Sequence, residues 1–128
     1  MMPVAHFEIH ASDPEKTGKF YTDIFGWKLT KWDGPIEYYL LSTKTENVGI
    51  DGAIVRRRTG LPANGAATNA YVCTIAVDSL DRVMQQVTDR GGEIVVAKDE
   101  VPGIGWLAYA KDPEGNIFGM LQPNQPNR

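Results

Sequence analysis

The segment VAHFEIHASDPEKTGKFYTDIFGWKLT, residues 4–30, holds a strand pattern, a helix start and a helix end in close succession. Residues 4–11 alternate between an apolar and a more polar face, which is typical of a half-buried β-strand. Asp13 can cap a helix that begins at Pro14, and Gly26 can end that helix in the left-handed conformation. Within the helix an apolar stripe is predicted, made of Phe20, Tyr21, Ile24 and Phe25.

The same order of elements then occurs a second time. Residues 3–58 read as a strand, a helix and three strands, and residues 70–122 repeat this order about 66 positions later. Because an internal repeat decides the architecture, the sequence predicts an α+β fold. The fold consists of two βαβββ modules that form a curved mixed sheet around a cavity. The predicted boundaries are a first module at 1–58, a linker at 59–69, a second module at 70–122 and a flexible tail at 123–128.

Turn-forming residues delimit the individual strands. After the first helix we expect strands at 27–30, 36–42 and 48–57. In the second half we expect strands at 70–77, 93–97, 106–110 and 117–121.

Composition and charge exclude several classes of function. The net charge of −3 argues against a nucleic-acid-binding protein, which usually presents a basic surface. No apolar stretch approaches the length of about 20 residues that a membrane-spanning helix needs. The N-terminus lacks the basic and apolar regions of a signal peptide. Cys73 is the only cysteine, which suits a reducing compartment, and it lies in an apolar run that predicts a buried thiol. We therefore expect a cytoplasmic protein.

The first strand places three ionisable side chains on one face: His6, Glu8 and His10. Such a face is unusual for a strand with a buried side, and His6 and Glu8 are candidates for general acid–base work. Residues two apart on a strand are about 6.6 Å from each other, so two neighbours can approach one ion. His6 and His10 are about 13 Å apart, so a metal would need donors from other strands, with Asp51 and Glu37 as the nearest candidates.

Two segments carry a resemblance to a known family. HFEI with DPEKTGKFYTDIFGWKL in the first half, and YAKDPEGNIFGMLQP in the second, resemble the vicinal oxygen chelate superfamily. This superfamily includes lactoylglutathione lyase (glyoxalase I), bleomycin- and fosfomycin-resistance proteins and extradiol dioxygenases. The resemblance covers nearly the whole chain and implies the glyoxalase/bleomycin-resistance fold. It is less specific for activity, because one scaffold hosts several chemistries.

The resemblance also implies four positions for a divalent metal in members of the glyoxalase type. By spacing these positions fall on His6, Ile54, Val72 and Gly119. Only His6 has a metal-binding side chain, and one imidazole does not hold a divalent cation. We therefore expect no metal and no other cofactor, with a divalent metal as the less favoured alternative.

Strand alternation and the family pattern together give a set of residues expected to face the cavity and bind a ligand: His6, Glu8, His10, Ile54, Arg56, Leu107, Tyr109 and Gly119. Apolar walls with a few polar groups are typical of small-molecule pockets. The alternative is that the inward apolar side chains simply fill the space between strands.

Three hypotheses about function follow from this set. The first is a metal-free protein that binds a small organic ligand, as bleomycin-resistance proteins do. The second is a lyase, isomerase or dioxygenase of the glyoxalase type that acts on a small carbonyl or thiol-conjugate substrate. The third is a protein with a vestigial cavity whose partner is another protein. The expected partners are a small-molecule ligand and a second copy in a homodimer, with neither nucleic acid nor a membrane.

Overall fold

The computed structural model describes residues 1–66 and 71–124, which form two compact units. The first unit spans His6–Tyr71, and the second joins Met1–Ala5 to Val72–Arg128. The first five residues, which the sequence assigned to the first module, thus belong to the second unit, where Pro3 O accepts a hydrogen bond from Ala76 N. The end of the predicted linker, the predicted start of the second module at Ala70, and positions 125–128 of the predicted tail lie outside the described residues.

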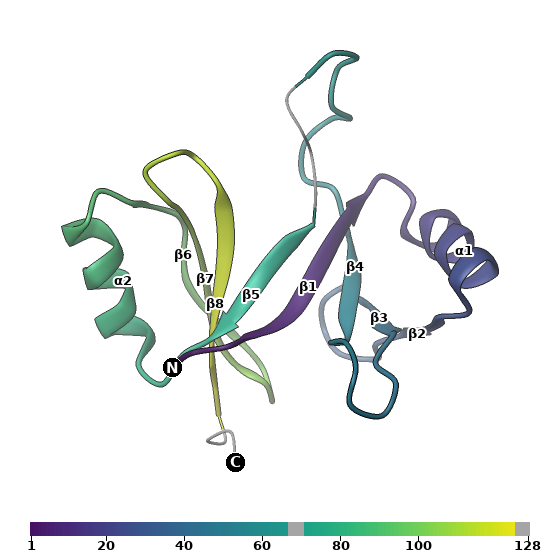
Figure 1. The fold of residues 1–128 in the computed structure, drawn as a ribbon, viewed down its shortest axis with the longest axis horizontal. Helices are drawn as coiled ribbons and strands as arrows, with labels where there is room; N and C mark the ends of the chain where they lie inside the picture. The colour runs from purple at the N-terminus through teal and green to yellow at the C-terminus, as the bar shows by residue number, and fades with distance from the viewer. Residues whose placement is uncertain (67–70, 125–128) are drawn as a thin grey trace. The chain divides into compact units, whose positions relative to one another are not determined.

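The first unit contains one helix and a mixed sheet (Figure 1). Its elements are β1 (Val4–Ala11, of which Val4 and Ala5 count with the second unit), α1 (Pro14–Phe25), β2 (Lys28–Lys31), β3 (Tyr39–Ser42) and β4 (Gly52–Arg56). The strand order is β2-β3-β4-β1. β1 runs parallel to β4, whereas the pairs β2–β3 and β3–β4 are antiparallel.

The second unit repeats this arrangement. Its elements are β5 (Val72–Ala76), α2 (Leu80–Asp89), β6 (Glu93–Val101), β7 (Gly105–Lys111) and β8 (Ile117–Pro123). The strand order is β5-β8-β7-β6, with β5 parallel to β8 and the other pairs antiparallel. In each unit the helix packs on its own strands (Figure 1). The predicted α+β fold with two βαβββ modules is confirmed.

The helix caps predicted at Asp13 and Gly26 are also confirmed. The Asp13 carboxylate accepts a hydrogen bond from Lys16 N at 3.1 Å, and Gly26 ends α1 with φ of 74°. In α2 the Ser79 hydroxyl accepts from Arg82 N at 3.3 Å. These side chains satisfy backbone N–H groups that the first turn of a helix leaves without partners.

Three strand boundaries differ from the prediction by three residues or more. β3 begins at Tyr39 rather than at 36, and β4 begins at Gly52 rather than at 48. The late start of β4 has a local reason: Asp51 Oδ1 accepts hydrogen bonds from Thr43 N and Lys44 N at 2.9 Å each, which forms a turn where the sequence predicted a strand. β6 continues to Val101 rather than ending at 97, because two register shifts let it keep pairing with β7.

Each unit has its own apolar core. The first consists of Phe7, Ile9, Ala11, Tyr39, Leu41 and Ile54, and the second of Val77, Leu80, Ala108, Ala110 and Met120. Neither α1 nor α2 has the length and apolar character of a membrane-spanning helix, and these are the helices of the described part.

The apolar stripe of α1 and Cys73 are more exposed than the sequence pattern indicates. Of the predicted stripe on α1 only Tyr21 packs against the core, whereas Phe20, Ile24 and Phe25 are 57%, 57% and 58% exposed. The helix docks instead through Gly18, where a Cβ atom would come within 2.5 Å of Leu29 Cδ2. Cys73 is exposed rather than buried.

The cap of α1 gives a test of the first unit. Replacing Asp13 with Ala leaves the N–H of Lys16 without its acceptor and should lower the free energy of unfolding by about 1 kcal/mol. Urea denaturation measures this change. The control is Asp23→Ala, which removes only an exposed ion pair with Lys19 and should cost about 0.5 kcal/mol or less. Equal losses in both variants would contradict the role of Asp13.

Candidate functional site

β1 separates two kinds of side chain onto its two faces. Side chains of paired residues in adjacent strands lie on the same side of a sheet. Ile9 pairs with Ile54, which in turn pairs with Tyr39, and all three lie in the core. Glu8 and His10 point to the opposite side of the sheet, where the paired β4 residues are Ala53 and Val55.

This register corrects the predicted orientation of two residues, Ile54 and Arg56. Ile54 was expected to share a face with His6, but it is 0% exposed in the core on the opposite face. Arg56 pairs with Ala11 and therefore also belongs to the opposite face. The prediction for β4 was wrong by one residue, and because side chains alternate with period two, such a slip moves every side chain to the wrong side.

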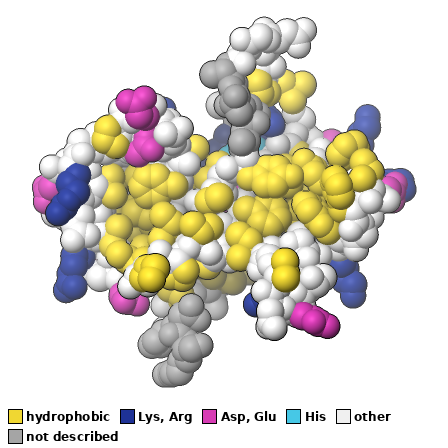
Figure 2. All heavy atoms as spheres, viewed as in Figure 1, with side chains coloured by type: hydrophobic (Ala, Val, Ile, Leu, Met, Phe, Trp, Pro, Cys, Tyr) yellow, Lys and Arg dark blue, Asp and Glu magenta, His cyan; other side chains and the backbone are white. Residues whose placement is uncertain are grey.

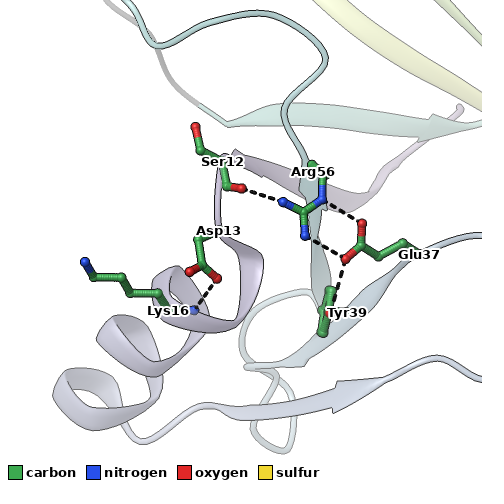
Figure 3. A network of polar contacts seen from close by, with 6 residues as sticks. All are labelled: Ser12, Asp13, Lys16, Glu37, Tyr39 and Arg56. Carbon is green, nitrogen blue, oxygen red and sulfur yellow. Dashed lines mark hydrogen bonds and ion pairs between the residues drawn. The ribbon is translucent and has the colours of Figure 1, made fainter.

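Arg56 instead holds the end of the sheet together (Figure 3). Its Nε and Nη2 atoms donate to the two carboxylate oxygens of Glu37 at 2.8 and 3.0 Å, and Nη1 donates to Ser12 O at 2.6 Å. The hydrogen bonds from Arg56 hold the pKa of Glu37 below its usual value. The hydroxyl of Tyr39 also donates to Glu37, at 3.3 Å. The side chains of Arg56 and Glu37 are thus engaged with each other.

On the polar face, His6 contacts a tyrosine that the sequence analysis did not identify. His6 Nε2 and the Tyr38 hydroxyl are 2.9 Å apart, and both residues are half-buried. Burial lowers the pKa of His6, and the nearby carboxylates of Glu8 and Asp51 only partly oppose this shift. Burial and the charge of Glu8 raise the pKa of Tyr38. At neutral pH both groups are thus uncharged, and each can donate or accept a proton in a hydrogen bond.

Glu8 and His10 form a second polar pair on the same face. Glu8 is 5% exposed, and its Oε1 accepts a hydrogen bond from His10 Nε2 at 3.1 Å. His10 is the more accessible partner, with 34% of its side chain exposed. An ionised carboxylate only accepts hydrogen bonds, so this contact places the imidazole proton on Nε2 and leaves Nδ1 as an acceptor when the ring is neutral.

In the second unit the three predicted site residues do share a face. Gly119 pairs with both Thr74 and Tyr109, and Leu107 lies two residues from Tyr109 on the same strand. The core residues Ala108 and Met120 lie on the other face, against α2. Thr74, which the sequence analysis missed, is a buried polar residue on this face. A Cβ atom at Gly119 would come within 3.0 Å of Thr74 Oγ1, so the glycine allows this close approach.

The donors present do not fit a metal site of the glyoxalase type. Val72 and Gly119 offer no side-chain donor, and Ile54 points into the core. Asp51 lies near His6, but its Oδ1 atom already accepts two backbone N–H groups. Within residues 1–66 and 71–124, no group of three or more His, Cys, Asp or Glu side chains is placed to hold a metal ion. The predicted cavity lined by both modules stays a prediction.

The pKa of His6 gives a test of this geometry. Because the folded-state pKa lies below the ordinary value of 6.5, the unfolded chain binds more protons once the pH falls below 6.5. The stabilisation from the neutral ring is complete above pH 6.5 and is lost as the pH falls toward the folded-state pKa. Urea denaturation should show that the free energy of unfolding decreases as the pH falls from about 7.5 to about 5. His6→Gln should flatten the slope.

Replacing Tyr38 tests whether burial or the contact with the Tyr38 hydroxyl lowers the pKa of His6. Tyr38→Phe keeps the burial of His6 but removes the hydroxyl partner, so the pKa of His6, followed by NMR titration of its ring protons, should stay below 6.5. A return of this pKa to 6.5 in Tyr38→Phe would contradict burial as the main cause.

Comparison with curated proteins finds relatives over most of the chain. A glyoxylase-like domain-containing protein of Didymella fabae is 31% identical over 124 residues, covering 91% of each chain. CFP32 of Mycobacterium bovis is 29% identical over 119 residues, or 92% of this chain. The lactoylglutathione lyase GLX1 of Arabidopsis thaliana is 27% identical over 124 residues, or 91% of this chain. The chain spans only 44% of the length of CFP32 and 43% of that of GLX1.

Solved structures share the fold at low sequence identity. Methylmalonyl-CoA epimerase from Mycobacterium tuberculosis has a TM-score of 0.64 at 13% identity, covering 94% of this chain and 87% of the epimerase chain. A superfamily member from Vibrio splendidus has a TM-score of 0.59 at 19% identity, covering 95% of this chain and 99% of that one. A family model matches residues 4–120 of the sequence. The chain therefore belongs to the Glyoxalase/Bleomycin resistance protein/Dioxygenase superfamily.

Proposed function

We propose that this protein binds a small organic ligand on the polar face of β1 and that its own side chains, rather than a metal ion, contact the ligand. The observation that carries this proposal is the pair of polar contacts on that face, His6 with Tyr38 and Glu8 with His10. The face is on the side of the sheet away from the core of the first unit, so these groups are not needed to fill that core.

The energetics of these groups support a binding role. A polar group that is withdrawn from water costs free energy unless it is hydrogen-bonded. Glu8 is almost fully buried and yet is held by His10, which itself remains accessible. The arrangement offers a ligand a donor and an acceptor in fixed positions, which is how small-molecule sites achieve specificity.

A second candidate is a proton-transfer enzyme of the same superfamily. The specific observation in its favour is the contact of His6 with Tyr38, because burial keeps the imidazole neutral and able to accept a proton near pH 7. A lactoylglutathione lyase lies among the relatives, and a methylmalonyl-CoA epimerase shares the fold. In this reading His6 is the base and Tyr38 positions its ring.

We also assign the chain to a reducing, cytoplasmic environment, since its single cysteine forms no internal disulfide.

Ligand binding is tested by a thermal-shift screen with planar aromatic compounds, thiol conjugates and antibiotics. A compound at about 100 times its Kd stabilises the native state by about 2.7 kcal/mol, which raises the melting temperature by several degrees. Glu8→Gln should reduce this rise, because it removes the charge that orients His10. The matched control is Glu15→Gln on exposed α1, which should leave the rise unchanged. A compound that stabilises the wild type, Glu8→Gln and Glu15→Gln equally would bind outside the polar face of β1.

We further propose that the protein is a homodimer that buries the exposed apolar surface of α1. This surface consists of Phe20, Ile24 and Phe25 and continues into an aromatic cluster, where the Tyr21 and Trp27 rings stack at 5.2 Å. Figure 2 shows hydrophobic side chains gathered on the face of the first unit in view. Exposed apolar patches of this kind mark interaction sites, and two-fold dimers are the commonest assembly.

Analytical ultracentrifugation tests the dimer. The wild-type protein should sediment with twice the mass of one chain, and Phe20→Glu combined with Phe25→Glu should shift it to the monomer. Both residues are exposed, so the monomeric variant should keep its fold, as circular dichroism would show. The control is Val48→Glu, an equally apolar exposed position in the turn before β4, which should remain dimeric. A monomeric wild-type protein would contradict the proposal.

A further inference from the structure

Two neighbouring arginines at the end of β4 have opposite surroundings. Arg56 lies on the α1 side of the sheet, where the Glu37 carboxylate neutralises it. Arg57 is the next residue in the alternation, which assigns it to the side that carries Glu8 and His10. Its backbone N–H donates to Ala11 O at 2.8 Å, so the pairing with β1 continues through this residue.

The guanidinium of Arg57 is anchored but not neutralised. Nη2 donates to the backbone oxygen of His10 at 2.8 Å, which anchors the group on β1. Nε is buried and has no hydrogen-bond partner in the described part of the chain. None of the ion pairs formed within residues 1–66 and 71–124 includes Arg57, in contrast to Arg56. A partly buried cation without a counter-ion favours the binding of an anion.

We propose that Arg57, beside His10, is the anion-binding end of the polar face and takes an oxyanion group of the ligand. This inference rests on the proposed function and narrows the ligand to small acids with a carboxylate or phosphate group. The buried Nε faces the protein, so the contacts to the oxyanion come from Nη1 and the remaining Nη2 hydrogen. These donors form a planar fork that matches two oxygens of a carboxylate or phosphate.

The other charge on this face determines where the oxyanion lies. Glu8 is two residues from His10 along β1, and its carboxylate would repel an anion placed at the middle of the strand. The hydrogen bond from His10 already engages Glu8 Oε1. The ligand therefore places its acidic group at Arg57 and its neutral part along His10 and Glu8.

The test is an NMR titration of the full chain with two simple anions, sodium acetate and inorganic phosphate. Sodium chloride at equal ionic strength is the reference. In the wild-type protein the Arg57 Nε–H and His10 backbone N–H signals should shift and saturate in the low millimolar range with an oxyanion but not with chloride. Arg57→Met should abolish the His10 shift, and Arg57→Lys, which keeps the charge but not the fork, should weaken it at least tenfold. The control is Arg58→Met, the exposed neighbour, which should titrate like the wild type.

Each outcome has a definite meaning. Saturation with acetate alone, with phosphate alone or with both supports the site and identifies the acid group it takes. No saturable shift, an equal shift with chloride, or a His10 shift that survives in Arg57→Met overturns the inference, and the wild-type titration decides this even if a variant fails to fold. If the anion titration is negative but the thermal-shift screen finds compounds whose stabilising effect is reduced in Glu8→Gln, the anion site is wrong and the proposed function still stands. The two failures are therefore distinguishable.

Discussion

The alternation of side chains along β1 is the constraint on which the first unit depends. Phe7, Ile9 and Ala11 form part of the core, and this fixes His6, Glu8 and His10 on the opposite face. A strand that faces an apolar core on one side can carry costly polar groups on the other without weakening that core. Here these groups are organised in pairs, so the cost of their burial is offset by hydrogen bonds.

The parallel pairing of β1 with β4 then assigns every residue of β4 to one of these two environments. Ile54 completes the core, and Arg56 binds Glu37 and the carbonyl at Ser12, joining the end of β1 to the segment before β3. One residue further on, Arg57 meets His10 instead. The register therefore gives two neighbouring arginines different roles. Arg56 stabilises the fold, whereas Arg57 is the proposed anion site.

Much of the fold could be predicted from the sequence, because its signals are local. The caps at Asp13, Gly26 and Ser79 depend only on residues within a few positions, and the repeat shows that both halves share one topology. The polar face of β1 was predicted for the same reason. The register of β4 could not be predicted, since it depends on which β4 residue pairs with Ile9, a contact between strands that are far apart in the sequence. Tyr38 and Thr74 were missed because their roles depend on contacts across strands, and the exposure of Phe20 depends on the close approach of Leu29 to Gly18.

The sharpest question is whether this face meets its ligand through side chains or through a bound cation, and metal analysis of the purified protein answers it. The protein would be incubated with Zn²⁺, Ni²⁺, Fe²⁺ and Mn²⁺ in turn, dialysed, and measured by mass spectrometry of the elements. We expect far less than one ion per chain, with the ring signals of His6 and His10 unchanged in NMR spectra. One tightly held ion per chain, accompanied by a shift of the His6 ring signals, would contradict the metal-free site.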